Sequence, residues 1–215
     1  MTPKLIIFDL DGTLVDAVPA VTEAANRVRA RKSLADVDPG FVRKVMGNPD
    51  DYGGETALLV GPSAGGKERR DALMLFGRNL DVVFTDFARP YPGVEEGLKL
   101  LQRQGIKLAI VANRITLFLH QWVEWLGWAS YIQCIVGVDM VAHPPPAPNA
   151  IEYVLRFLEV SPAEACLVAD GGPELSAGIQ YGIRTIQATY GYADQLPHLT
   201  GITRFEELSG IVFAS

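Results

Sequence analysis

Short apolar runs alternate with amphipathic segments along most of the chain. The segments of strand length, most of them apolar, are residues 5–8, 107–111, 131–136, 165–169 and 184–188. The segments with a helical spacing of apolar positions are residues 116–126, 149–159 and 174–181, preceded by the shared face of Val94, Leu98 and Leu101. Strands that alternate with helices of this length predict an α/β, Rossmann-like fold, in which right-handed crossovers cover both faces of a parallel sheet with helices.

Residues 16–85 break this alternation. Ala, Arg, Glu and Leu dominate there, glycine-rich breaks fall at residues 53–54 and 61–66, and runs of β-branched residues are scarce. This composition predicts several helices joined by loops. We therefore expect two domains: an α/β core made of residues 1–15 and 86–215, and a small helical domain, residues 16–85, inserted after the first strand.

The overall composition is that of a globular protein and argues against two classes of partner. The 215 residues carry a net charge of −6 and a pI of about 5.1, so the long-range field does not favour nucleic acid. No apolar run approaches the roughly 20 residues that cross a bilayer, and the first residues lack the pattern of a signal peptide. We expect a cytoplasmic protein that binds neither nucleic acid nor a membrane, with Cys134 and Cys166 as buried thiols in strands.

Acidic side chains follow two of the predicted strands. Asp9 and Asp11 come after residues 5–8, and Asp170 follows residues 165–169. Open α/β sheets bind their ligands at the edge where the carboxyl ends of the strands meet. Two close carboxylates repel each other, and either a divalent cation or a shared proton relieves that repulsion. Acidic, oxygen-rich sites suit Mg²⁺ when a substrate supplies phosphate oxygens. The alternative is that Asp9 begins a turn completed by Asp11 and Gly12.

Residues 8–16, with the sequence Phe-Asp-Leu-Asp-Gly-Thr-Leu-Val-Asp, match the signature of the haloacid dehalogenase superfamily. The chain resembles the phosphoglycolate-phosphatase-like members of that superfamily over nearly its whole length. Residues 91–94, 111–114, 145–148 and 168–170 look like the remaining landmarks of the family, in the same order. The resemblance implies that the helical insert is a cap, that the protein is a hydrolase, and that its substrate is a small phosphorylated metabolite.

The resemblance also implies a role for each acid. Asp9 attacks phosphorus to form an aspartyl-phosphate, while Asp11 protonates the leaving oxygen and later deprotonates water. Asp9, the backbone carbonyl of Asp11, and Asp170 hold Mg²⁺, with Glu174 as a further acid on the metal side. The dehalogenases of the superfamily lack a carboxylate at the position of Asp11. Asp11 therefore favours phosphate esters over halides as substrates.

The chain departs from the family pattern at three positions. Ala112 stands where a Ser or Thr hydroxyl binds phosphate, Pro145 where a lysine offsets the negative charges, and Glu174 where Asp is usual. Loss of one preorganised donor slows a reaction by on the order of 10²–10³, so we expect a weakened phosphatase. Two cations are candidates to replace the lysine: Arg114, because guanidinium suits phosphate, and His143.

Substrate contacts are expected beside the acids. Gly12 and Thr13 belong to the signature, Asn113 can present its backbone N–H, and Arg114 its guanidinium. A different class of function stays open: a catalytically inactive protein of the same fold that binds a phosphorylated metabolite or a protein partner. An aspartyl-phosphate signalling receiver shares the nucleophile but does not account for the helical insert.

Two weaker signals have ordinary structural interpretations. Residues 61–67 resemble a phosphate-binding P-loop, but Glu68 stands where that loop needs Ser or Thr, so a connector between helices is favoured. Trp122, Trp125 and Trp128 recur at helical spacing, which is typical of a core. If that helix is exposed instead, it suits a homodimer contact.

Overall fold

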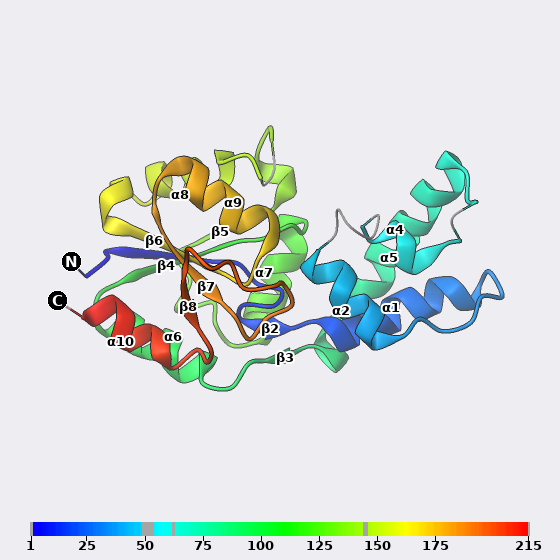
Figure 1. The fold of residues 1–215 in the computed structure, drawn as a ribbon, viewed down its shortest axis with the longest axis horizontal. Coiled ribbons are helices and arrows are strands. Elements are labelled where there is room, and N and C mark those ends of the chain that lie inside the picture. Colours follow the sequence, from blue (N-terminus) through cyan, green and yellow to red (C-terminus); the bar gives the residue numbers. More distant parts are fainter. Residues whose placement is uncertain (1, 49–53, 62, 144–145, 215) are drawn as a thin grey trace. The chain divides into compact units, whose positions relative to one another are not determined.

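The structure, a computed structural model, describes residues 2–48, 54–61, 63–143 and 146–214. The chain divides into two compact units, one made of residues 1–15 with 90–215 and the other of residues 16–89 (Figure 1). The chain passes between them through β2 (Val15–Asp16) and β3 (Arg89–Pro90), which pair as a two-stranded sheet. None of the described helices has the length and apolar character of a membrane span.

The first unit is built on a parallel sheet. In the described residues this sheet has six strands in the order β5-β4-β1-β6-β7-β8. The strands are β1 (Leu5–Phe8), β4 (Lys107–Val111), β5 (Cys134–Val136), β6 (Ala165–Ala169), β7 (Arg184–Ala188) and β8 (Thr200–Ile202). Leu5 pairs with Lys107 of β4 on one side and with Ala165 of β6 on the other. The predicted parallel α/β fold is confirmed.

Helices cover both faces of this sheet (Figure 1). They are α6 (Val94–Arg103), α7 (Thr116–Trp125), α8 (Asn149–Phe157), α9 (Gly172–Tyr181) and α10 (Glu207–Phe213), with short 3₁₀ turns η1 (Val138–Met140) and η2 (Pro162–Glu164). Alternate side chains of β1 point to opposite faces. Leu5 and Ile7 join the core under α8 and α9, whereas Phe8 packs against Phe205, with ring centroids 5.8 Å apart. Because both faces are covered, β1 is apolar throughout.

The strands at 5–8, 107–111, 165–169 and 184–188 have the bounds that the sequence predicts. The predicted strand at 131–136 is shorter, because the N–H groups of Tyr131 and Ile132 donate to the carbonyl of Trp128 and prolong the turn after α7. The predicted helix at 149–159 ends at Phe157 because Glu159 takes a left-handed conformation, with φ of 54°. The helix predicted from residue 174 begins two residues earlier, at Gly172.

Several predicted buried side chains lie where expected. Both cysteines are free and buried in strands, and burial raises the pKa of Cys134 to about 11 and that of Cys166 to about 12. Trp122 and Trp128 are also buried in the core, whereas Trp125 is 49% exposed. The tryptophan pattern is therefore mostly a core pattern, with one ring at the surface.

The second unit is helical. It contains α1 (Val18–Ala30), α2 (Pro39–Gly47), α4 (Thr56–Leu59) and α5 (Gly66–Phe87), and α1 packs along α5. The buried residues of α1 include small ones such as Ala24, and those of α5 include larger ones such as Phe76. The boundary expected at residue 85 falls inside α5, because Val83 and Phe84 are buried and carry the helix on to Phe87.

The P-loop-like residues 61–67 run into the start of α5, and residue 62 lies outside the described residues. Glu68 forms an ion pair with Lys32 of the same unit, at 2.8 Å. The segment therefore leads from one helix of the unit to the next, which supports the connector interpretation over a phosphate loop.

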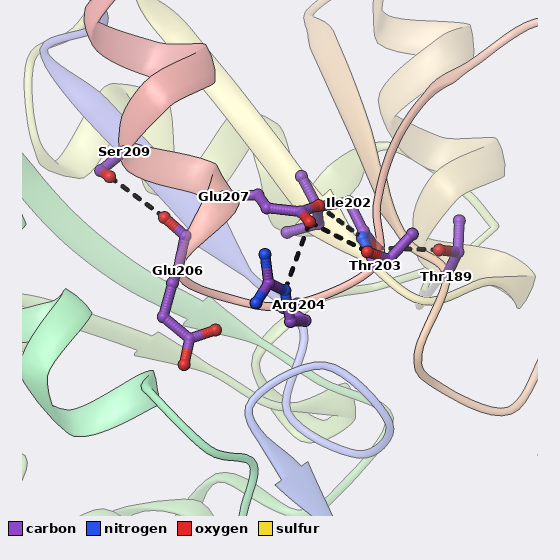
Figure 2. A network of polar contacts seen from close by, with 7 residues as sticks. All are labelled: Thr189, Ile202, Thr203, Arg204, Glu206, Glu207 and Ser209. Carbon is purple, nitrogen blue, oxygen red and sulfur yellow. Dashed lines mark hydrogen bonds and ion pairs between the residues drawn. The ribbon is translucent and has the colours of Figure 1, made fainter.

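The last strand and helix are held by a local polar network that the sequence analysis did not find (Figure 2). The N–H and hydroxyl of Thr203 donate to the two carboxylate oxygens of Glu207, at 2.8 and 2.9 Å. Thr189 donates its hydroxyl to the carbonyl of Ile202 at 2.9 Å, which ties β8 to the loop after β7. With only three residues and mixed polarity, β8 has no recognisable strand pattern.

Candidate active site

Acidic side chains meet at the carboxyl ends of β1 and β6. These strands are neighbours, and the N–H of Asp9 donates to the carbonyl of Val168 at 3.0 Å, which brings Asp9 beside Asp170. Glu174 lies in the first turn of α9. Asp9, Asp170 and Glu174 are 5%, 7% and 8% exposed, respectively. Asp9 and Asp170 therefore lie at the same edge of the sheet.

A tight turn follows Asp9 and shapes the site. The N–H groups of Leu14 and Val15 both donate to the carbonyl of Leu10, each at 3.0 Å. Gly12 has a φ of 89°, a conformation that glycine tolerates best. A Cβ at this position would overlap the carboxylate of Asp170. Gly12 thus lets the chain pass close to Asp170, in keeping with its place in the signature.

Thr13 joins the two strand ends. Its side chain is fully buried, and its hydroxyl donates to Asp9 Oδ2 at 3.1 Å. The oxygen of the Thr13 hydroxyl in turn accepts from the N–H of Asp170 at 2.8 Å. The sequence analysis expected Thr13 to contact the substrate. In the structure the hydroxyl is engaged with Asp9 and Asp170, so it orients those acids.

The loop after β7 holds Asp170 from the other side. The N–H of Tyr192 donates to Asp170 Oδ2 at 2.7 Å. Gln187 is fully buried, and its amide donates to the carbonyl of Asp170 at 2.8 Å. Gly191 approaches so closely that a Cβ there would overlap the Asp170 side chain. The hydroxyl of Tyr190 donates to the carbonyl of Thr13 at 2.7 Å.

This loop was not among the predicted site residues, although the sequence contains a signal for it. Residues 190–192 follow a predicted strand, as Asp9 and Asp170 do, and therefore belong to the same edge of the sheet. These residues are Tyr-Gly-Tyr and include no acid, and it is the backbone N–H of Tyr192 that supplies the hydrogen bond to Asp170.

The acids raise one another's pKa values. Burial raises the pKa of Asp9 well above its usual range, and the charges of Glu174, Asp170 and Asp11 add to the rise. Burial likewise raises the pKa of Asp170 to about 6 and that of Glu174 to about 7. A buried carboxylate is stabilised by a proton or by a cation. This cluster is therefore suited to bind either.

Asp11 is paired with Arg114, which lies 103 residues away in the sequence. Nε and Nη2 of Arg114 are each 2.9 Å from Asp11 Oδ2, and both side chains are 16% exposed. The other oxygen, Oδ1, is buried and accepts no hydrogen bond within the described part of the protein. The structure thus brings together two residues that the sequence analysis had selected separately.

The remaining predicted positions lie as follows. Ala112 is buried, and its N–H donates to the carbonyl of Val136 at 3.2 Å. Asn113 and His143 are exposed. Pro145, the residue in the place of the family's lysine, lies outside the described residues. The backbone N–H of Ala112 is therefore engaged in the sheet, and its methyl group offers no donor.

The donor set is suited to Mg²⁺. Among the described residues, no three Asp, Glu, His or Cys side chains are arranged to hold a metal ion by themselves. A magnesium site, however, commonly uses only one or two carboxylates and completes its shell with water and phosphate oxygens. Asp9 and Asp170, which the hydroxyl of Thr13 joins, supply two carboxylates of this kind.

The chain matches known proteins over most of its length. A family model described as haloacid dehalogenase-like hydrolase matches residues 6–188. The phosphoglycolate phosphatase of Psychrobacter arcticus is 29% identical over 219 residues, which cover 99% of this chain and 95% of that protein. A plasmid phosphoglycolate phosphatase of Cupriavidus necator is 31% identical over 188 residues, which cover 87% and 81%. A crystal structure described as a predicted phosphoglycolate phosphatase from Haemophilus somnus has the same fold, with a TM-score of 0.87, 24% identity and 98% of each chain covered.

Proposed function

Because the chain belongs to the haloacid dehalogenase-like hydrolase family, we propose that it is a Mg²⁺-dependent phosphatase for a small phosphate monoester. Relatives named phosphoglycolate phosphatase support this substrate class. The observation that carries the proposal is the junction of Asp9 and Asp170 through the hydroxyl of Thr13, with Asp11 two residues further along. A small phosphorylated carboxylic acid such as phosphoglycolate is the first substrate to test.

Asp9 is the nucleophile in this proposal. Thr13 holds one of its carboxylate oxygens, and the other attacks phosphorus. The bond from phosphorus to the ester oxygen breaks, and Asp11 gives its proton to that oxygen. Asp11 then removes a proton from the water that attacks the aspartyl-phosphate, which releases inorganic phosphate and restores Asp9.

Mg²⁺, held by Asp9, Asp170 and the backbone carbonyl of Asp11, would supply positive charge for the phosphoryl oxygens. Glu174 lies beside these acids, in the first turn of α9. Burial is the largest cause of the raised pKa of Asp9, and the charge of Glu174 is the next largest. We propose that Glu174 accepts hydrogen bonds from the metal's water ligands.

Turnover is proposed to be slow because of Ala112. A hydroxyl at this position would bind a phosphoryl oxygen, and loss of one such donor lowers kcat by on the order of 10²–10³. Ala112→Ser adds the hydroxyl with a single extra atom in a buried position. We expect kcat to rise by at least about tenfold in this variant. An unchanged kcat would mean that the missing hydroxyl is not what limits turnover.

The decisive assay is release of inorganic phosphate from a panel of phosphate monoesters in the presence of Mg²⁺. The matched control is Asp9→Asn, which keeps the shape of the side chain and removes the nucleophilic carboxylate. We expect measurable hydrolysis of at least one small monoester by the parent protein and none above background by the variant. Equal rates for the two proteins across the panel would overturn the proposed activity.

The same panel separates the rival function, an inactive protein that binds phosphorylated ligands. Ala112 and the pairing of Asp11 with Arg114 are the observations that favour it. It predicts binding of phosphate compounds by the parent protein without release of phosphate. Hydrolysis that depends on Asp9 would rule it out.

A further inference from the structure

The site has a strong imbalance of charge. Four acids meet here: burial raises the pKa of Asp9, and the charges of Glu174, Asp170 and Asp11 raise it further. Among the described residues, Arg114 is the one basic side chain that forms an ion pair with any of them. The other candidate cation, His143, is exposed. In the part of the chain that the structure describes, Arg114 is therefore the cation that a phosphate dianion would contact on entering this site.

The ion pair leaves one carboxylate oxygen of Asp11 unused. Two nitrogens of the guanidinium converge on the single oxygen Oδ2 of Asp11, while Oδ1 is buried without a partner in the described residues. A guanidinium binds best when its parallel N–H groups meet two oxygens of one ligand. A phosphate group presents such a pair of oxygens. It would therefore satisfy Arg114 better than the carboxylate does.

Resting on the proposed function, we propose that Arg114 is the phosphate-binding cation of this site and that Asp11 occupies it until a phosphate group displaces the carboxylate. One event then has two effects. The substrate becomes anchored on Arg114, and the Asp11 carboxylate is released from its ion pair to exchange protons with the ester oxygen and water. Both side chains are 16% exposed, so water can reach the pair while the partners exchange.

Binding of inorganic phosphate to the full chain in a chelating buffer, followed by calorimetry, tests this exchange without any turnover. Arg114→Gln should weaken phosphate binding by roughly tenfold or more, as expected when hydrogen bonds to a charged group are lost. Arg114→Lys keeps the charge but not the two parallel N–H groups of the guanidinium, and should bind phosphate with intermediate affinity. His143→Gln is the control for the other candidate cation and should bind phosphate as the parent does.

Asp11→Asn supplies the sharper half of the test. Removal of the competing carboxylate should tighten phosphate binding, and the tightening should be about fivefold greater with Arg114 present than in the Arg114→Gln background. Equal tightening in both backgrounds would show simple repulsion by Asp11 and would overturn the exchange. Parent-like affinity in Arg114→Gln would overturn the assignment of Arg114.

These results are independent of the hydrolysis assay. If no monoester in the panel is hydrolysed, the phosphate affinities of the two single variants and the double variant can still show coupling between Asp11 and Arg114. If Asp9-dependent hydrolysis is found while the two substitutions have additive effects on phosphate affinity, the proposed exchange is wrong and the proposed phosphatase activity is retained. Thermal unfolding of each variant establishes that a loss of binding is not a loss of folding.

Discussion

Gln187 offers a test of how a residue that is not an acid holds the acidic site. This fully buried side chain donates from Nε2 to the carbonyls of Asp170 and Asp194, at 2.8 and 2.9 Å. Its Oε1 accepts from the N–H of Leu196 at 2.7 Å. The perturbation is Gln187→Leu, which keeps a similar volume and removes all three hydrogen bonds.

The magnitude follows from the three backbone groups left behind. A buried polar group without its partner costs about 1–3 kcal/mol, and the bonds to Asp194 and Leu196 are only partly buried, so the free energy of unfolding should fall by about 3–6 kcal/mol. That is a large share of the roughly 5–15 kcal/mol that stabilises a typical protein. For a chain of this size each kcal/mol moves Tm by about 2–4 °C, so Tm should fall by on the order of 10 °C.

A second effect is expected at the metal site. Gln187 fixes the carbonyl of Asp170 and the loop whose Tyr192 N–H orients the carboxylate. The variant should therefore bind Mg²⁺ more weakly, and saturating Mg²⁺ should raise its Tm by less than it raises that of the parent protein.

The assay is chemical and thermal unfolding of both proteins with and without Mg²⁺. The control is Gln121→Leu, at an exposed position of α7, which should change stability by no more than about 0.5 kcal/mol. If the free energy of unfolding of Gln187→Leu lies within about 1 kcal/mol of that of the parent protein, the three hydrogen bonds do not hold the loop as the geometry indicates. Unchanged Mg²⁺ stabilisation would refute the link to Asp170.

The remaining predictions concern pH and packing. In the folded state the pKa of Asp170 rises from 3.8 to about 6 and that of Glu174 from 4.5 to about 7, chiefly through burial. Over that window the folded state holds more protons than the unfolded chain. The free energy of unfolding of the metal-free protein should therefore fall by a few kcal/mol as pH rises from about 4 to about 7. Denaturant titrations across this pH range check the sign. The free energy of unfolding of Glu174→Gln should depend less steeply on pH than that of the parent protein, and a free energy of unfolding that rises with pH in the parent would contradict the prediction. Gly97→Ala should destabilise by about 1–3 kcal/mol because its methyl group would overlap the Phe205 ring. Gly77→Ala in α5, with open space around it, should stabilise by about 0.5–1 kcal/mol; equal effects on Tm would refute the packing argument.

Most of the sheet could be predicted from local pattern. Residues 5–8 and 165–169 are short apolar runs closed by acids, and each forms a strand with the expected bounds. Such strands are buried on both faces, so their apolar character is continuous and easily recognised. The strand at residues 200–202 escaped prediction because its pairing with β7 and the network around Thr203 define it, and neither is visible in three residues of sequence.

The acids themselves were also predictable. Asp9, Asp11 and Asp170 follow apolar strands, and parallel strands place their carboxyl ends at one edge. Their supporting partners were not predictable in the same way. Gln187 lies in a strand of mixed polarity and does not stand out there, and only the fold shows that it reaches the carbonyl of Asp170.

Residue type and short spacing were enough to predict the alternation of strands and helices and the edge of the sheet at which the acids gather. The missing hydroxyl at Ala112 followed from the resemblance to the family. The tertiary structure decided that Thr13 joins Asp9 to Asp170 and that Arg114 pairs with Asp11. Those contacts link residues up to 157 positions apart. Sequence separation carries no information about such distances, which are set by strand order and by the way the loops pack at the edge of the sheet.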